Sequence, residues 1–185
     1  MMIYTTNFGE ALYPYLTIPD MKFDPQGKYH VKLKVKSDEA QPDIAIINEV
    51  IAKKIADFTK DNPNKEIKRS ELPYQLTDDG YVIFNFKMKA SGINSKTKQP
   101  FEQKPKIFDH NLELLPEDKS IWGGSIIRVT YEPFGYSGAA TGIGCTLRLK
   151  SVQVRKLVEG SLNHGFTKVE PEITRPAIIA AANNF

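Results

Sequence analysis

The stretch Lys28-Tyr29-His30-Val31-Lys32-Leu33-Lys34-Val35-Lys36 decides the fold class, because apolar and basic side chains alternate along it without exception. Successive side chains of a β-strand point to opposite faces, so this pattern predicts a strand with one buried face and one basic face. The turn sequence Asp24-Pro25-Gln26-Gly27 precedes it. We expect a further strand around residues 11–18, paired antiparallel with the first.

One amphipathic helix is expected directly after this strand. Asp38 or Asp43 is expected to cap its first turn, and Asp61-Asn62-Pro63-Asn64 to end it. Apolar side chains recur at spacings of three or four, which places them on one helix face. These side chains are Ile44, Ile47, Ile51, Ile55 and Phe58. Such a helix is suited to cover one side or end of a sheet.

Three later segments also alternate between apolar and polar residues, namely residues 81–89, 125–133 and 143–157. In the last segment the alternation changes phase at Ser151, which predicts a β-bulge. A short strand is expected at residues 106–109. These segments, together with the basic strand, predict a mainly β protein.

The segments between the strands complete the prediction of the fold. Residues 90–105 and 135–140 are expected to be loops, and periodicity is lost after residue 157. Several strands with one helix between the early and the later ones favour a small OB-like barrel over a sandwich. We therefore predict an OB-fold-like antiparallel five-stranded barrel with one amphipathic helix over residues 1–160, followed by a C-terminal tail over residues 161–185.

The composition excludes several classes of protein. A chain of 185 residues with 41% hydrophobic and 25% charged residues suits one folded domain with a tail. It holds no apolar run of membrane-spanning length, and its N-terminus lacks the features of a secretion signal. The single cysteine, Cys145, has no partner for an internal disulfide. We expect a cytoplasmic protein without membrane contact.

Catalytic and metal-binding motifs are missing from the sequence. The three histidines lie in separate segments, and Gly142-Ile143-Gly144 lacks the third glycine of a nucleotide-binding loop and precedes a strand. The acidic pairs Asp78-Asp79 and Glu117-Asp118 lie beside turn residues, where solvated charges are typical. We predict a protein that is not an enzyme and needs neither cofactor nor metal.

Lysines interleaved with aromatic residues are the recurring feature of the chain. The net charge is only +3, but between Lys87 and Lys106 six lysines stand against one acid, Glu102. Single-stranded nucleic acids bind to cations that follow the phosphates and to aromatic rings that stack on the bases. The predicted contact residues are Lys32, Lys34, Lys36, Tyr81, Lys87, Lys89, Lys96, Lys98, Phe101, Lys104, Lys106, Arg128, Tyr136, Arg148 and Lys150.

Each of these residues also has a structural interpretation. Alternating lysines are typical of a solvated strand face or of an edge protected against aggregation. Tyr81 is covered by the preceding connector in one alternative, and Phe101 packs into a small apolar cluster in another. Tyr136, within Gly135-Tyr136-Ser137-Gly138, is expected to be an exposed loop aromatic.

The C-terminal half of the chain carries a recognisable order of elements. Trp122-Gly123-Gly124-Ser125 opens a strand that ends at Pro133, Tyr136 follows in an aromatic loop, and a strand closes with the segment 149–157, Leu-Lys-Ser-Val-Gln-Val-Arg-Lys-Leu. This order resembles the bacteriophage single-stranded DNA-binding proteins of the podovirus replication type. The upstream segments Leu12-Tyr13-Pro14, 28–36 and 106–109 extend the resemblance to about residues 8–160. It implies an OB-fold that coats single-stranded DNA during phage replication or recombination, in the cytoplasm of the infected bacterial host.

The C-terminal tail differs from that family in charge. Family members carry a strongly acidic tail whose terminal aromatic residue contacts replication partners. Phe185 matches that aromatic, which implies a contact with replication proteins such as a polymerase or a helicase. From Lys168 onward, however, two acids and two bases cancel. The tail either remains flexible, or it packs Ile173, Ile178, Ile179 and Phe185 on the barrel or on a neighbouring subunit, with residues 176–182 as a short helix.

Two hypotheses for the function follow from these observations. The first is a monomeric or homodimeric protein that binds and protects single-stranded DNA, largely without sequence preference, in phage DNA replication and recombination. The alternative is a phage structural or assembly protein that uses the barrel for protein contacts. Salt-dependent binding of oligo-dT discriminates between them, since only the first hypothesis requires neutralised phosphates.

Overall fold

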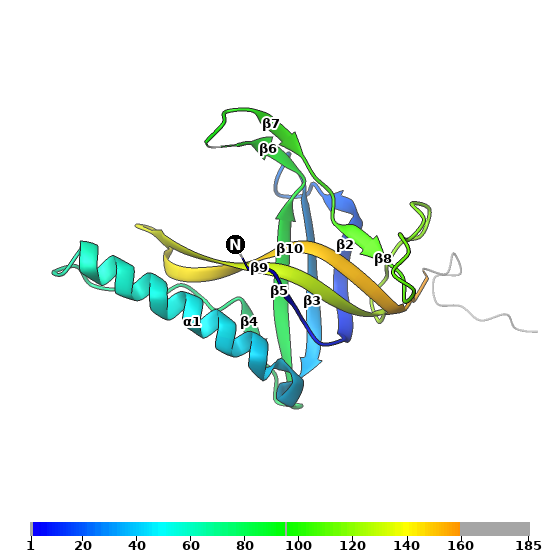
Figure 1. Ribbon diagram of the computed structural model, residues 1–185, viewed down its shortest axis with the longest axis horizontal. Helices are drawn as coiled ribbons and strands as arrows, with labels where there is room; N and C mark the ends of the chain where they lie inside the picture. Colours follow the sequence, from blue (N-terminus) through cyan, green and yellow to red (C-terminus); the bar gives the residue numbers. More distant parts are fainter. Residues whose placement is uncertain (1, 95, 160–185) are drawn as a thin grey trace, which may run out of the picture.

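The computed structural model describes residues 2–94 and 96–159, which form a β-barrel with one long helix packed against it (Figure 1). Most of the regular structure within these residues is strand, as the alternating segments predict. The elements are β1 (Tyr4–Thr5), β2 (Gly9–Asp20), β3 (Lys28–Lys36), α1 (Ser37–Asp61), β4 (Tyr74–Leu76), β5 (Tyr81–Lys89), β6 (Ser91–Ile93), β7 (Pro100–Glu102), β8 (Lys106–Phe108), β9 (Ile126–Gly138) and β10 (Gly142–Lys156).

Five of these strands form a ring in the order β9, β2, β3, β5 and β10, and β10 pairs back with β9. The contact of β2 with β9 is limited to Gly9 and Glu10, and β5 meets β10 through two residue pairs, so the barrel is only partly closed. This arrangement confirms the predicted OB-like barrel. One strand pair departs from the antiparallel arrangement, because β5 and β10 run parallel.

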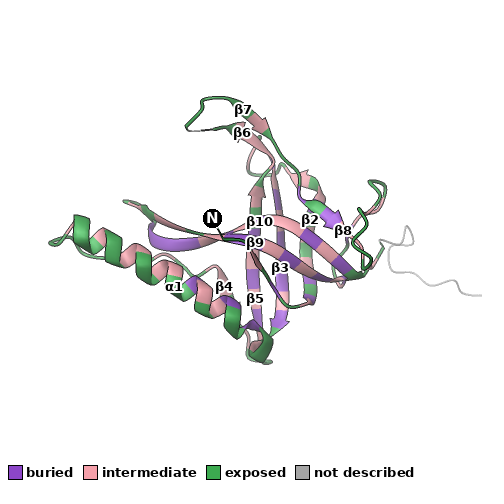
Figure 2. Ribbon diagram, in the orientation of Figure 1, coloured by how far each residue is buried: buried purple, intermediate pink, exposed green. Residues whose placement is uncertain are grey.

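The core is the inward face of the ring. Burial alternates along β3 and β5, as Figure 2 shows. Leu33, Phe84 and Tyr131 are fully buried, and the Phe86 and Tyr131 rings lie 5.3 Å apart between their centres. Burying a large apolar side chain contributes about 1.5–3 kcal/mol to folding. The inward apolar set therefore fixes the register, and with it which side chains face outward.

Helix α1 packs against the barrel, and its fully buried side chains lie in its first half. Ala40 and Ile47 are fully buried, and the Tyr131 hydroxyl donates a hydrogen bond to Asp43 Oδ1 at 2.6 Å. Asp43 therefore ties the helix to the barrel, and the prediction that it or Asp38 caps the helix is wrong. Lys36 occupies the N-cap position and makes no side-chain capping hydrogen bond.

Two segments predicted as loops contain paired strands. Within residues 90–105, β6 and β7 form a hairpin that projects from the barrel (Figure 1). Residues 135–138 belong to β9, with Tyr136 paired to Gly144, so the expected loop is reduced to the turn at residues 139–141. Both segments contain glycine and serine, which do not show the apolar–polar alternation that predicts a strand. In the structure, pairing with a neighbouring strand satisfies the backbone hydrogen-bonding groups of both segments.

Two further predictions for this half of the chain, the short strand and the β-bulge, are confirmed. The strand at residues 106–109 is β8, which pairs parallel with β10, and the register of β10 shifts between Leu149 and Ser151 as expected for a bulge. The predicted tail, residues 161–185, lies outside the described residues. No helix in residues 2–94 and 96–159 is long and apolar enough to span a membrane.

Candidate nucleic-acid interface

Basic side chains from three adjacent strands lie on one outer face of the barrel. The strand register sets Lys28 of β3 beside Lys89 of β5, and Lys87 of β5 beside Arg148 of β10. Alternation sends all of them outward, because their neighbours along each strand are the core residues. We call this face the cationic belt and define it by Lys28, Lys32, Lys87, Lys89, Arg148 and Lys150.

A groove of about 710 Å³ runs along the part of the cationic belt next to β9 and the β6–β7 hairpin. Six of the residues predicted from the sequence line this groove. They are Lys87, Lys89, Phe101, Tyr136, Arg148 and Lys150. The groove therefore brings together cations and aromatic rings from β5, β7, β9 and β10, as single-stranded nucleic acid requires.

A second groove, of about 250 Å³, continues the belt toward β2. It shares Lys28 and Lys87 with the first groove and adds Lys32 and Phe23. Phe23 lies in the turn between β2 and β3 with 86% of its surface exposed, and the Lys22 ammonium lies 5.2 Å from its ring centre. Sequence reasoning missed Phe23, although an aromatic residue beside the turn sequence Asp24-Pro25 was an available signal.

Lys87 lies where the two grooves meet. Partial burial lowers the pKa of the Lys87 ammonium, and the nearby Lys28 and Lys32 lower it further. Such mutual repulsion means that a bound anion would be stabilised by several cations at once. The electrostatics at this point of the belt therefore favour a phosphate group.

Two residues that the sequence did not single out organise the β9–β10 end of the belt. The Arg148 guanidinium lies 3.5 Å from the centre of the Phe134 ring, which is partly exposed. Glu132 is buried beside them, and its carboxylate forms ion pairs with the Lys150 ammonium at 2.8 Å and with the Arg148 guanidinium at 3.9 Å. Glu132 and Phe134 lie where the sequence predicts the end of a strand. The sequence pattern therefore did not indicate that they pair with residues of β10.

Tyr136 lies across β10 and is not a free loop side chain. It is half-buried, and a Cβ atom added at its strand partner Gly144 would lie 2.7 Å from the Tyr136 hydroxyl oxygen. Glycine at position 144 therefore makes the room for the Tyr136 ring. The prediction of an exposed loop aromatic is corrected to a strand aromatic whose ring edge borders the larger groove.

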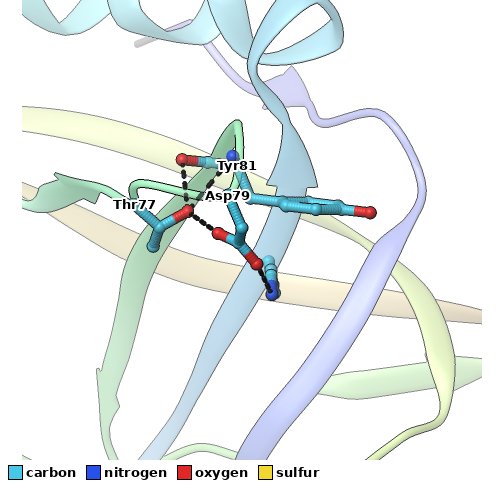
Figure 3. A network of polar contacts seen from close by, with 4 residues as sticks. Thr77, Asp79 and Tyr81 are labelled. Carbon is cyan, nitrogen blue, oxygen red and sulfur yellow. Dashed lines mark hydrogen bonds and ion pairs between the residues drawn. The ribbon is translucent and has the colours of Figure 1, made fainter.

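The other end of β3 carries a compensated cation. The Lys34 ammonium lies 2.7 Å from the Asp79 carboxylate and 4.3 Å from the centre of the Tyr81 ring. Figure 3 shows Asp79 and Tyr81 with Thr77 beside them. Thr77 completes the network, because its hydroxyl donates to Asp79 and its oxygen accepts the Tyr81 N–H. The hydrogen bond between Lys34 and Asp79 raises the pKa of the ammonium and lowers the pKa of the carboxyl. Asp79, expected to be a solvated loop charge, is in fact paired.

Lys34, Tyr81 and Lys36 line a separate cleft of about 530 Å³ together with Phe8 and Arg155. The outward residue Arg128 belongs to the same side of the barrel. Its guanidinium lies 5.0 Å from the centre of the Phe8 ring, and its Nε donates to the Gln153 side chain at 2.7 Å.

The remaining predicted residues lie away from both grooves of the belt. Lys96 and Lys98 are exposed in the connection between β6 and β7. Lys104 and Lys106 line another cleft, where the Lys104 ammonium lies 3.6 Å from Glu117. The structure thus gathers one part of the predicted set on the belt and distributes the rest over other surfaces.

Comparison with known proteins gives consistent matches in sequence. The family described as single-stranded DNA-binding protein of bacteriophage T7 matches residues 9–157. The single-stranded DNA-binding protein of Enterobacteria phage T3 is 26% identical over 177 residues, which covers 84% of this chain and 76% of that protein. The corresponding protein of Escherichia phage T7 is 25% identical over the same length and coverage.

Solved structures share the fold. The crystal structure of gp2.5, a single-stranded DNA-binding protein encoded by bacteriophage T7, has a TM-score of 0.75 at 24% identity and covers 91% of this chain and 99% of that chain. The single-stranded DNA-binding protein from bacteriophage Enc34, in complex with single-stranded DNA, has a TM-score of 0.55 at 18% identity, covering 85% and 88%. Since the family match spans the ring of five strands and helix α1, this chain belongs to the bacteriophage T7 family of single-stranded DNA-binding proteins.

Proposed function

We propose that this chain binds and protects single-stranded DNA, largely without sequence preference, during phage DNA replication and recombination in the cytoplasm of the bacterial host. The observation that carries the proposal is the continuity of the cationic belt through two grooves that share Lys28 and Lys87. Family membership supports DNA binding over the alternative of an assembly protein.

Two kinds of interaction would hold the DNA on the belt, ion pairs with the phosphates and stacking on the bases. Lys28, Lys32, Lys87 and Lys89 follow the phosphates, while Phe23 and Phe101 offer ring faces to the bases. Stacking contributes about 1–3 kcal/mol per base and tolerates any sequence, since every base has a π-face. Outward lysines confer no sequence preference either, because phosphates are the same at every position.

The other residues predicted from the sequence are proposed as flanking contacts for a strand that extends beyond the two grooves. Lys34, Lys36, Tyr81 and Arg128 would meet it at one end of the barrel. The hairpin and the segment after it would extend the path elsewhere, through Lys96, Lys98, Lys104 and Lys106.

The proposal includes no catalytic step, cofactor or metal. Burial raises the pKa of the Cys145 thiol to about 11, so the one cysteine stays protonated at neutral pH and is a poor nucleophile. We further propose that the protein acts as a monomer or homodimer and that Phe185 contacts a replication protein such as a polymerase or a helicase.

The test is a titration of labelled oligo-dT at several salt concentrations. A path of about 4–6 phosphate contacts predicts a slope of about −3 to −4 in a plot of log affinity against log salt for a single strand. A duplex of the same length, measured in parallel, reports the preference for single strands. A slope near zero, or no binding at low salt, would exclude the DNA-binding function and leave the assembly hypothesis.

A further inference from the structure

An apolar cleft of about 740 Å³ lies on the barrel between β2 and the segment that precedes β9. Tyr13, Ile18 and Trp122 line it with 73%, 71% and 54% of their surfaces exposed. Among the described residues that line it, Glu10 is the one charged side chain, and none carries a positive charge. Exposed clusters of large apolar side chains mark interaction surfaces, and one without cations is suited to a peptide and not to DNA.

The backbone of β2 is arranged to face this cleft. The pairing of β2 with β3 shifts register between Leu12 and Tyr15, and Tyr13 has a φ of +49°. This irregularity turns both Tyr13 and Tyr15 into the lining of the cleft. Beyond Ala11, whose backbone is hydrogen-bonded to Gly124 and Ser125, this edge of β2 has no neighbouring strand among the described residues. Such an edge accepts an added peptide segment.

The described part of the chain ends at the rim of the same cleft. The Trp122 N–H donates to the Val158 carbonyl at 3.3 Å, and the Val158 N–H donates to Ser125 Oγ at 2.9 Å. The chain therefore continues into residues 160–185 from a point beside Trp122. A segment tethered so close has an effective concentration in the millimolar range, so even weak apolar contacts would hold it.

We propose that residues 176–182, Pro176-Ala177-Ile178-Ile179-Ala180-Ala181-Ala182, dock in the Trp122 cleft of their own chain. The segment is uncharged and carries two adjacent isoleucines, so its apolar side chains suit the apolar lining of the cleft. The cationic belt, on β3, β5 and β10, is basic and is therefore a less favourable surface for this segment. The docking is independent of the proposed DNA binding, because the two surfaces share no residue.

Trp122 is the chain's one tryptophan, so its fluorescence reports directly on the cleft. Docking predicts that the full chain shows blue-shifted emission and protection from acrylamide. Ending the chain after Asn163, or replacing Ile178→Asp together with Ile179→Asp in the full chain, should shift the emission to longer wavelength and raise the quenching. A synthetic peptide of residues 170–185 should reverse both changes in the shortened chain.

The matched control is Asn183→Asp with Asn184→Asp, which adds the same charge to the tail without removing an apolar side chain and should leave the emission unchanged. Oligo-dT affinity, measured on the same samples, should stay within about fivefold of the full chain and shows that each variant is folded. Equal emission and quenching in the full chain and in the Ile178→Asp, Ile179→Asp variant would overturn the proposal. An emission shift on simple dilution of the full chain would also overturn it, because the occupant would then be a second copy.

Discussion

The Glu132 carboxylate lies 2.8 Å from the Lys150 ammonium at the β9–β10 end of the cationic belt, with 6% of its side chain exposed. Arg148 lies on its other side at 3.9 Å. An acid buried between two cations of the proposed DNA-binding face fixes their positions, and it would also compete with a phosphate for their charge. Glu132 thus sets how much positive charge this end of the belt presents.

Replacing Glu132→Gln should therefore strengthen binding of oligo-dT by about 1 kcal/mol, roughly fivefold, and steepen the salt dependence. The amide keeps the shape of the side chain and releases Lys150 and Arg148 for phosphates. Oligo-dT titrations at several salt concentrations measure both effects. Glu117→Gln, which removes the same charge beside the flanking residue Lys104, is the control and should change the affinity by less than half as much, because the Glu117 carboxylate is exposed and lies 3.6 Å from the ammonium. Weaker binding by Glu132→Gln would instead mean that positioning outweighs charge.

Phe23→Ala should weaken oligo-dT binding by about 1–3 kcal/mol without changing the salt slope, because the lost interaction is stacking and not a phosphate contact. The exposed ring packs little in the free protein, so the melting temperature should hardly change. Trp122→Ala removes another exposed aromatic side chain, remote from the belt, and should leave the affinity as it is. A reduced salt slope for Phe23→Ala would contradict the stacking role.

Alternation explains why the barrel could be predicted from the sequence. In β3 and β5 one face is buried and the other is basic, so the period of two fixed both the core and most of the belt. The hairpin β6–β7 and the end of β9 could not be predicted in this way. Their strands are short or rich in glycine and serine, and pairing partners far along the chain hold them in place.

The site could be predicted only where it follows from that alternation. The sequence predicts Lys34 to be an unpaired cation, yet it forms an ion pair with Asp79, which lies 45 residues away along the chain. Phe23 sits in a turn, and Glu132 is buried because of its neighbours on β10. The roles of these residues depend on contacts between segments that are distant along the chain, and the alternation within one strand does not indicate such contacts.

Belt lysines and peripheral lysines should differ in the salt dependence of binding. Lys32→Ala with Lys87→Ala should reduce the slope by about 1.4, since each lost phosphate contact changes it by about 0.7 for a single strand. Lys104→Ala with Lys106→Ala removes the same charge from a cleft outside the belt grooves and should change the slope by less than half as much. Equal slopes for the two variants would indicate that the DNA follows β8 as closely as β5.

Asp43 links the stability of the fold to pH. Burial raises the pKa of this carboxyl above its ordinary value of 3.8, and the hydrogen bond from Tyr131 opposes the rise only in part. The native state therefore holds a proton that the unfolded chain releases when the pH lies between the two pKa values. In that window the free energy of unfolding falls as the pH rises, by about 1.4 kcal/mol for each unit by which the pKa is raised.

Asp43→Asn keeps an oxygen that accepts the Tyr131 hydrogen bond and removes the charge, so this variant should lack that pH-dependent loss. Its stability relative to the unaltered chain should increase as the pH rises from about 4, and should become constant above the native pKa of Asp43. Urea unfolding across this pH range measures the difference. Asp38→Asn, an exposed position in the first turn of the same helix, should instead lower stability slightly at neutral pH, because it removes an anion from the positive end of the helix dipole. A pH-independent difference for Asp43→Asn would show that the buried carboxyl titrates as it does in the unfolded chain.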